Sequence, residues 1–320
     1  MRINNRDNFA IYTQGLTKKF GSLTAVNQLN LSIETGSIYG FLGPNGCGKS
    51  TTIRMLCGLL TPTSGTAEVM GFAIPQQAEA LKKQVGYMTQ KFSLYGDLTV
   101  VENLKFMGQI FGLNHRYLKT RIDELISRYN LLAQKDQRVA SMSGGQKQRL
   151  ALAASVMHKP ALLFLDEPTS AVDPENRRDF WEKLFDLSES GTTILVSTHY
   201  MDEAERCHQL AILERGAMKA EGTPEKLMQE IAAEVVEVKG SHLRQLKSQL
   251  LAFPEIKSVA QQGIRLRVLV DKNVSHPIEF IKTKITDEDL ECNMAHPSLE
   301  DVFVTVTGNS ISETANKGNA

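Results

Sequence analysis

Apolar residues follow two different periods along the chain, and the changes between them divide it into segments. From 9 to 33 apolar and polar positions alternate around a turn at 20–22, which predicts antiparallel strands. Runs of consecutive apolar residues are typical of strands buried on both faces; they lie at 38–42, 85–89, 161–167 and 192–199. From 91 to 158 the spacing is helical instead. The pattern therefore predicts an α/β domain with a flanking antiparallel β layer and a helical insertion over 91–158.

The pattern changes again after Gly222-Thr223-Pro224. Strands are expected at 235–238, 257–261 and 264–270, and helices at 242–251 and 277–285. The order strand-helix-strand-strand-helix suggests a small ferredoxin-like α+β domain. A length of 320 residues allows about two domains. We therefore expect domains at 9–222 and 223–308, followed by a polar tail over 309–320 that is expected to be disordered.

A glycine-rich loop connects the apolar strand at 38–42 to a helix. It reads Gly43-Pro44-Asn45-Gly46-Cys47-Gly48-Lys49-Ser50-Thr51 and fits the G-x-x-x-x-G-K-[ST] pattern of a phosphate-binding loop. Backbone N–H groups of such a loop, together with the helix N-terminus, surround phosphates. Lys49 would reach the outer phosphates, and Ser50 would bind Mg²⁺. The alternative, a glycine-rich turn that holds no ligand, is disfavoured by the strand before it and the helix after it.

Two acidic residues, Asp166 and Glu167, end the buried strand that starts near 161. Ligands of open α/β sheets bind at this carboxyl edge, where the phosphate-binding loop also lies. Asp166 fits a Mg²⁺ partner, and Glu167 fits a general base that polarises an attacking water. A solvated acid pair at a strand end is the alternative interpretation.

A second pair of glycines lies at the start of a helix, in the run Ser143-Gly144-Gly145-Gln146. Such a helix start with a serine hydroxyl forms another anion cradle. One nucleotide needs only one phosphate loop, so the second cradle is expected to meet the nucleotide of another subunit. In isolation the run would be an ordinary helix N-cap.

Composition narrows the classes of function. Lys and Arg number 36 and Asp and Glu also 36, so no basic excess points to nucleic acid as a partner. The polar start 1–8 has no apolar signal-peptide core, and no apolar run approaches the ~18 residues of a membrane span. The four cysteines are scattered, which suggests reduced thiols in a cytosolic setting. We expect a soluble or peripheral protein.

Taken together, these motifs resemble the ATP-binding subunits of ABC transporters over about residues 9–222. The phosphate-binding loop resembles the Walker A motif, 162–167 the Walker B motif with its catalytic glutamate, and 143–146 the signature motif. Gln90 matches the Q-loop, 170–173 the D-loop, and His199 the switch histidine. Phe20 falls where this family has an adenine-stacking aromatic residue, although it could also be an ordinary strand-core residue.

The resemblance implies ATP and Mg²⁺ as cofactors and a head-to-tail dimer that encloses the nucleotides. It implies that Gln90 senses Mg²⁺ and a membrane partner, that His199 contacts the γ-phosphate, and that Asp173 couples the two sites. Ser143, Gly144 and Gly145 would bind the ATP of the opposite subunit, with Gln146 completing the motif. Lys49, Gln90, Glu167 and His199 are thus the expected catalytic residues, and Ser50, Gln90 and Asp166 the expected Mg²⁺ residues.

The C-terminal run 297–303 resembles the ATPases of bacterial ABC-2-type exporters. The resemblance implies a separate integral membrane permease and a location at the cytoplasmic side of the cell membrane. Phe92, Leu94 and Tyr95 are candidates for contacting that permease. Two other readings stay open: a soluble ABC ATPase acting on ribosomes or DNA, and a regulatory module whose C-terminal domain senses a ligand. Import is also possible.

Three positions depart from the family pattern: Cys47, where Ala or Ser is usual, and Met142 and Val172, where Leu is common. None removes a catalytic group. Cys47 is expected near Lys49 and a helix N-terminus, which both favour the reactive thiolate. The sequence thus predicts that a maleimide alkylates Cys47 and that MgATP protects it. A thiol packed away from solvent is the alternative.

Overall fold

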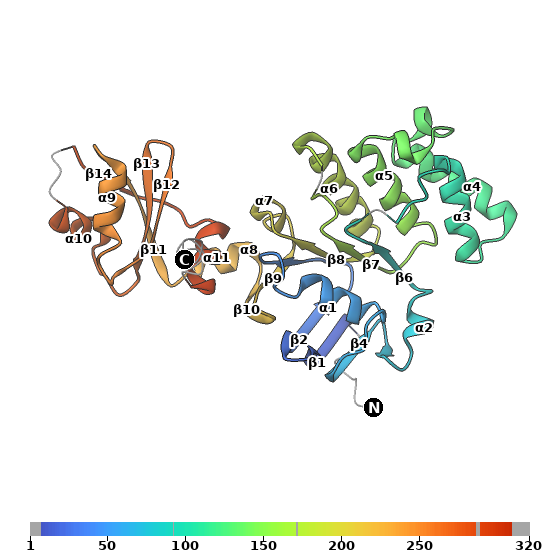
Figure 1. Ribbon diagram of the computed structural model, residues 1–320, viewed down its shortest axis with the longest axis horizontal. Helices are drawn as coiled ribbons and strands as arrows, with labels where there is room; N and C mark the ends of the chain where they lie inside the picture. Colours follow the sequence, from blue (N-terminus) through green and yellow to red (C-terminus); the bar gives the residue numbers. More distant parts are fainter. Residues whose placement is uncertain (1–7, 92, 171, 286–288, 309–320) are drawn as a thin grey trace. The chain divides into compact units, whose positions relative to one another are not determined.

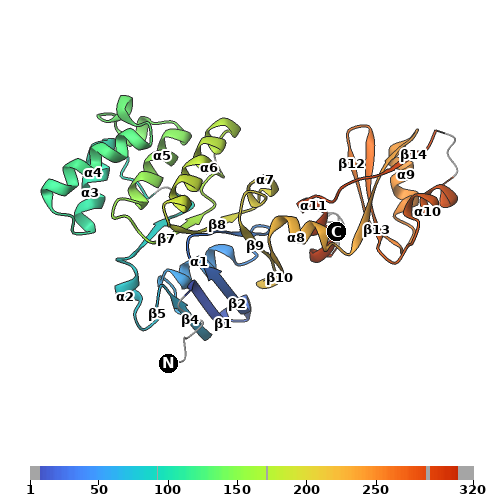
Figure 2. The ribbon, with the colours of Figure 1, turned by 180° about the vertical axis from the view of Figure 1, so that it is seen from behind.

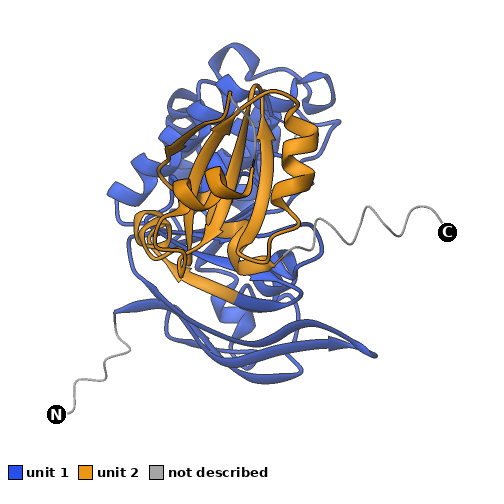
Figure 3. Ribbon diagram, turned by 90° about the vertical axis from the view of Figure 1, so that its left-hand side faces the viewer, with its two compact units in different colours: residues 1–218 blue, residues 219–320 orange. Residues whose placement is uncertain are grey.

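The structure is a computed structural model that describes residues 8–91, 93–170, 172–285 and 289–308. The chain forms two compact units, Met1–Met218 and Lys219–Ala320, coloured separately in Figure 3. The units divide four residues before the predicted boundary at Gly222. Phe92, Ala171 and the tail 309–320 lie outside the described residues.

An antiparallel sheet of four strands forms one layer of the first unit, in the order β2-β1-β4-β5. Its strands are β1 (Phe9–Phe20), β2 (Leu23–Glu34), β4 (Ser64–Val69) and β5 (Phe72–Ile74). The long β1–β2 hairpin confirms the strands predicted from alternation. The strand β4 was not predicted, because its sequence SGTAEV has few apolar residues and its first half is exposed.

The second sheet has the order β10-β9-β3-β8-β7-β6. Its strands are β3 (Ile38–Leu42), β6 (Val85–Met88), β7 (Leu162–Asp166), β8 (Thr193–Thr198), β9 (Gln209–Glu214) and β10 (Ala217–Gly222). Strands β3, β6, β7, β8 and β9 pair in parallel, and every residue of β3, β7 and β8 is buried, as the continuous apolar runs predict. Their carboxyl ends therefore meet at one edge of the sheet.

Helix α1 (Lys49–Leu56) lies between the two sheets (Figure 1). Ile53 and Leu56 of α1 belong to one buried apolar cluster with Phe41 and Phe164 of the parallel sheet and Leu29 of β2. Packing on both sides fixes the helix, and with it the loop at its N-terminus.

The rest of this unit is mostly helical, and helix α3 packs against both α4 and α5 (Figures 1 and 2). The helices are α2 (Ala78–Leu81), α3 (Val100–Ile110), α4 (His115–Arg128), α5 (Gly144–Ser155), α6 (Pro174–Glu189) and α7 (Met201–Ala204), with short 3₁₀ turns at Leu132–Gln134 and Val139–Ser141. Thr99 caps α3 in a capping box with Glu102. Ile110, the last residue of α3, is 59% exposed.

The second unit contains a four-stranded antiparallel sheet in the order β12-β13-β11-β14. Its elements are α8 (Pro224–Gln229), β11 (Ala233–Lys239), α9 (Leu243–Leu250), β12 (Ile256–Gln262), β13 (Arg265–Asp271), α10 (Pro277–Lys284), β14 (Glu291–Met294) and α11 (Leu299–Thr307). The βαββαβ order and sheet topology are ferredoxin-like, as expected, with a fourth strand that the sequence analysis missed. Among the described residues, no helix is both long and apolar enough to cross a membrane.

Candidate functional site

The glycine-rich loop connects β3 to α1 at the carboxyl edge of the parallel sheet. Gly48 precedes the first helical residue and has φ 107°, a backbone conformation that residues other than glycine rarely adopt. A Cβ at Gly48 would lie 2.5 Å from the backbone oxygen of Ala25 in β2, so this position has no room for a side chain. The antiparallel layer therefore helps to hold the loop in place.

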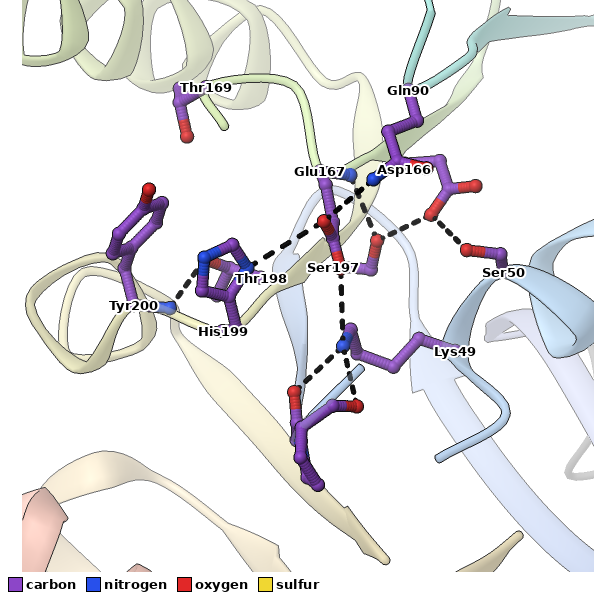
Figure 4. A network of polar contacts seen from close by, with 12 residues as sticks. Lys49, Ser50, Gln90, Asp166, Glu167, Thr169, Ser197, Thr198, His199 and Tyr200 are labelled. Carbon is purple, nitrogen blue, oxygen red and sulfur yellow. Dashed lines mark hydrogen bonds and ion pairs between the residues drawn. The ribbon is translucent and has the colours of Figure 1, made fainter. Parts of the chain in front are cut away.

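Lys49 is the first residue of α1, and its side chain is almost fully buried. Its Nζ donates to the backbone oxygens of Gly43 at 2.7 Å and Pro44 at 3.2 Å, and lies 3.3 Å from Glu167 Oε1 (Figure 4). The ammonium group is thus surrounded by oxygen acceptors. A phosphate at this loop would compete with Glu167 for the same ammonium group.

Asp166 ends β7 and joins the loop to the sheet. Its Oδ1 accepts hydrogen bonds from Ser50 Oγ at 2.8 Å and from Ser197 Oγ at 2.8 Å (Figure 4). Serine and carboxylate oxygens are the hard ligands that Mg²⁺ uses together with phosphate oxygens. Ser50 and Asp166 therefore fit a magnesium ion bound beside a nucleotide.

Glu167 lies at the centre of the polar network in Figure 4. Its Oε2 accepts a hydrogen bond from Gln90 Nε2 at 3.0 Å and lies 3.6 Å from Nδ1 of His199, which is longer than a hydrogen bond. Gln90 follows β6, Glu167 follows β7 and His199 follows β8. Three neighbouring parallel strands thus bring these three predicted side chains together at one edge.

The backbone of Glu167 is strained. Its φ is 48°, in the left-handed region that costs a non-glycine residue about 1–3 kcal/mol. Ser197 compensates, because its hydroxyl and its backbone oxygen both accept from the Glu167 N–H, at 3.0 and 3.2 Å. The surrounding structure therefore aims this carboxylate at Lys49 rather than along the strand.

The run Ser143–Gln146 forms the N-terminus of α5. Ser143 Oγ accepts from the N–H of Gln146, and Gln146 Oε1 accepts from the N–H of Ser143, so the two residues form a capping box. Within the described residues, no hydrogen bond or ion pair connects Ser143, Gly145 or Gln146 to Lys49, Ser50 or Glu167. The structure therefore does not bring the two predicted cradles together within this chain.

Gly145 packs against the start of α6. A Cβ at this position would lie 2.7 Å from Cγ of Asn176. Asn176 Oδ1 accepts from Arg149 of α5 at 2.9 Å, and Asn176 Nδ2 donates to Asp173, the N-cap of α6, at 2.8 Å. The bonds from the Asn176 side chain and backbone lower the pKa of Asp173. Asn176 thus connects two predicted motifs that are far apart in the sequence.

Phe20 ends β1 and is 49% exposed, which excludes the alternative that it belongs to the strand core. The ammonium group of Lys18 lies 5.0 Å from its ring centroid. The exposed ring of Phe20 is therefore available for stacking.

Cys47 differs from the sequence-based expectation. Its side chain is 3% exposed, and a Cβ at Gly43 would lie only 2.6 Å from its Sγ, so the thiol packs under the loop. Burial raises the pKa of the thiol, and the nearby Lys49 lowers it by less. The expected reactive thiolate was wrong, because the side chain faces the protein interior instead of the phosphate side.

Sequence reasoning missed several polar residues that hold the site. Ser197 and Thr198 are buried hydroxyl residues that directly follow the apolar run Ile194–Val196 of β8, a signal that could have identified them. Asn176 and Glu203 carry no recognisable motif, and their contacts come from elements distant in the sequence.

Comparisons with known proteins agree with this geometry. A family model described as ABC transporter matches residues 26–170. A probable multidrug ABC transporter ATP-binding protein of Escherichia coli is 46% identical over 217 residues, which are 68% of this chain but 38% of the relative's own length. A Nod factor export ATP-binding protein I of Bradyrhizobium diazoefficiens is 38% identical over 315 residues, covering 95% of this chain and 98% of that protein.

Solved structures are similar to a large part of this chain. One is a protein from Clostridium perfringens described as part of an ABC transporter complex, with TM-score 0.65 and 26% identity over 70% of this chain and 92% of that one. Another is a dimeric ATP-binding cassette in a post-hydrolysis state bound to ADP and Pi. It has TM-score 0.61 and 26% identity over 67% of this chain and 98% of that one.

Proposed function

We infer that this chain, which belongs to the ATP-binding subunits of ABC transporters, couples ATP hydrolysis to export through a separate membrane permease. As a member of this family the chain is an ATPase. The observation that carries the proposal is the network in which Lys49, Ser50, Gln90, Asp166, Glu167 and His199 converge at one sheet edge (Figure 4).

Each residue of the network has a defined task in this proposal. The loop 43–51 binds the phosphates through its N–H groups and Lys49. Ser50 and Asp166 hold Mg²⁺, with Gln90 beside them, and the metal neutralises charge on the phosphates. Phe20 stacks on the adenine ring.

Glu167 acts as the general base that accepts a proton from the attacking water, and His199 donates to the γ-phosphate. The ion pair between Lys49 and Glu167 gives this step an order. A bound phosphate takes over Lys49, and the carboxylate is then free to orient water. Hydrolysis therefore follows phosphate binding.

The second cradle, Ser143–Gln146, binds the ATP of another subunit in a head-to-tail dimer. Support comes from its separation from Lys49 within one chain and from the dimeric cassettes among similar structures. Asp173 connects the two nucleotide sites, since Asn176 joins it to Arg149 of the signature helix.

The permease is an integral membrane partner at the cytoplasmic side of the cell membrane. Export is supported by relatives named for Nod factor export and multidrug transport. Because the chain spans only 38% of the first of these relatives, the export proposal rests more on the Nod factor export proteins, which it matches over almost their whole length. Tyr95, which is 52% exposed, and Leu94 are candidate permease contacts.

Reconstitution tests this proposal. The chain is co-purified with the permease encoded by a neighbouring gene and placed in vesicles, and ATP-dependent substrate movement is measured. We expect transport with the wild-type chain and none with Glu167→Gln, whereas Glu189→Gln, an exposed substitution at the end of α6, should behave as wild type. ATP hydrolysis without any permease association would contradict the export proposal and favour action on ribosomes or DNA.

A further inference from the structure

A buried carboxylate that the proposed chemistry does not use accepts hydrogen bonds from Thr169 and Thr198, two residues labelled in Figure 4. Glu203 belongs to the short helix α7, four residues after His199, and is completely buried. A buried carboxylate costs free energy unless hydrogen bonds or opposite charges compensate it. The partners of Glu203 therefore show which parts of the structure this buried carboxylate stabilises.

Both oxygens of Glu203 accept hydrogen bonds from hydroxyl groups at the carboxyl edge of the sheet. Thr198 Oγ1 donates to Oε2 at 2.7 Å, and Thr169 Oγ1 donates to Oε1. Thr198 directly precedes His199, and Thr169 lies two residues after Glu167. One carboxylate thus joins the segment that carries the general base to the segment that carries the switch histidine.

A cation completes the cluster. Arg177 Nε of α6 lies 3.5 Å from Glu203 Oε1, and the Arg177 guanidinium stacks over the Tyr200 ring at 4.0 Å from its centroid. The rings of Tyr200 and His199 are 4.1 Å apart. The contacts of Arg177 therefore extend the cluster toward His199 from a third element.

The contacts of Glu203 lie next to a strained part of the backbone. Glu167 has the left-handed conformation described above, and such strain persists only when several contacts over-determine it. Ser197 fixes the Glu167 N–H, and the backbone oxygen of Pro168 accepts a buried hydrogen bond from Gln148 at 3.1 Å. Thr169 provides the next fixed point, because its hydroxyl donates to the Glu203 carboxylate.

We propose that Glu203 is a positioning residue that sets Glu167 and His199 relative to each other for hydrolysis. This inference rests on the proposed function. The carboxylate of Glu203 is completely buried and accepts hydrogen bonds from Thr169 and Thr198, so its effect passes through these two residues. Removing the link should lower kcat while leaving the phosphate-binding loop, and so the affinity for ATP, unchanged.

The test uses the full chain and a matched set of variants at Thr169 and Glu203. Thr169→Val removes the hydroxyl with little change in volume, Thr169→Ser keeps it, and Glu203→Gln keeps the size but removes the charge. Small misplacements of reacting groups can cost up to about 100-fold in rate. We expect kcat to fall about 10- to 100-fold in Thr169→Val and Glu203→Gln, to recover in Thr169→Ser, and KM to stay within about twofold.

Thr13→Val is the control for loss of a buried hydroxyl. Thr13 is 1% exposed in β1 and donates to the backbone oxygen of Leu29, away from the site. It should lower the melting temperature without changing kcat at 25 °C. A kcat in Thr169→Val equal to that of wild type, or equal losses of kcat in Thr169→Val and Thr13→Val, would overturn the inference.

Amide hydrogen exchange separates this inference from the proposed function. In Thr169→Val, exchange should increase in the peptides covering 167–173 and 197–204 and not in the loop 43–51. If the wild-type chain hydrolyses no ATP, the proposed function fails. Hydrogen exchange still shows whether Glu203 connects the segments of Thr169 and Thr198. Unchanged exchange in both peptides would contradict it.

Discussion

At the scale of single residues, the site stands out because one carboxylate serves several partners. Glu167 lies 3.3 Å from Lys49 Nζ, accepts from Gln90 and faces His199 while holding a disfavoured backbone conformation. Structure alone would favour a glycine or asparagine at such a φ. The presence of Glu167 there supports its proposed role as the general base.

Glu167→Gln should bind ATP at least as tightly as wild type and hydrolyse it about 10²–10⁴-fold more slowly. The substitution removes the base and also the anion that competes with phosphate for Lys49. Nucleotide binding by fluorescence and phosphate release measure the two effects, and Glu189→Gln is the matched control. Wild-type turnover in Glu167→Gln would remove Glu167 from the role of base.

Cys47 should resist maleimide at neutral pH in the folded protein, with and without MgATP. Burial raises the pKa of its thiol, so less thiolate is present near pH 7 than for an ordinary cysteine, and its fraction should rise only at more alkaline pH. Peptide mass spectrometry gives the labelled fraction, and unfolding in urea should expose all four buried thiols. Rapid, MgATP-sensitive labelling would instead support a thiol on the phosphate side.

At the scale of elements, α5 and α6 are connected by contacts that the sequence motifs do not reveal. The second glycine of the run Ser143–Gln146 gives room to Asn176, which Arg149 and Asp173 hold in place. Gly145 therefore has a packing role inside one subunit, besides its proposed approach to the nucleotide of another.

Gly145→Ala should destabilise the protein by about 1–3 kcal/mol, because the added methyl group overlaps the Asn176 amide. Asn176→Ala removes the obstacle. In a double-mutant cycle, the double variant should lose less stability than the sum of the single losses. Urea unfolding gives the free energies. Additive losses would show that the two side chains do not compete for this space.

Gly145→Asp would place a carboxylate in the second cradle, Ser143–Gln146, and could be used to test whether this cradle binds a phosphate of another subunit's ATP. The larger aspartate side chain would meet Asn176 before any nucleotide of another subunit. A loss of dimerisation in that variant is informative only if the same loss persists when Asn176→Ala is added.

At the scale of the whole molecule, every contact of the polar network comes from the first unit, Met1–Met218. The second unit has its own apolar core, with Val268, Leu250 and Ile281 among its buried residues. The second unit therefore has an apolar core of its own, and the boundary between the two units can be tested by truncation.

A chain ending after Gly222 should still bind ATP, because it keeps the network and β10. A chain ending after Met218 is the comparison, since it cuts β10 (Ala217–Gly222) and leaves β9 as an unpaired edge of the parallel sheet. We expect the chain that ends after Gly222 to be more stable, and less prone to aggregation, than the chain that ends after Met218. Loss of nucleotide binding in a folded chain of residues 1–222 would contradict the predicted domain boundary.

Local sequence patterns were enough to predict the β1–β2 hairpin, the buried parallel strands, the phosphate-binding loop and the order of its motifs. These features depend on local patterns: continuous apolar runs define buried parallel strands, and glycines with a lysine define the loop. Because the carboxyl ends of parallel strands share one edge, the meeting of Gln90, Asp166, Glu167 and His199 could also be expected.

Only the tertiary structure decided which side chains complete the site. The hydroxyl of Ser197, the buried carboxylate of Glu203 and the amide of Asn176 act through contacts between elements far apart in the chain. The direction of the Cys47 thiol was decided in the same way, by packing under the loop against Gly43. Such contacts depend on how neighbouring elements fill space, and no local period in the sequence encodes that.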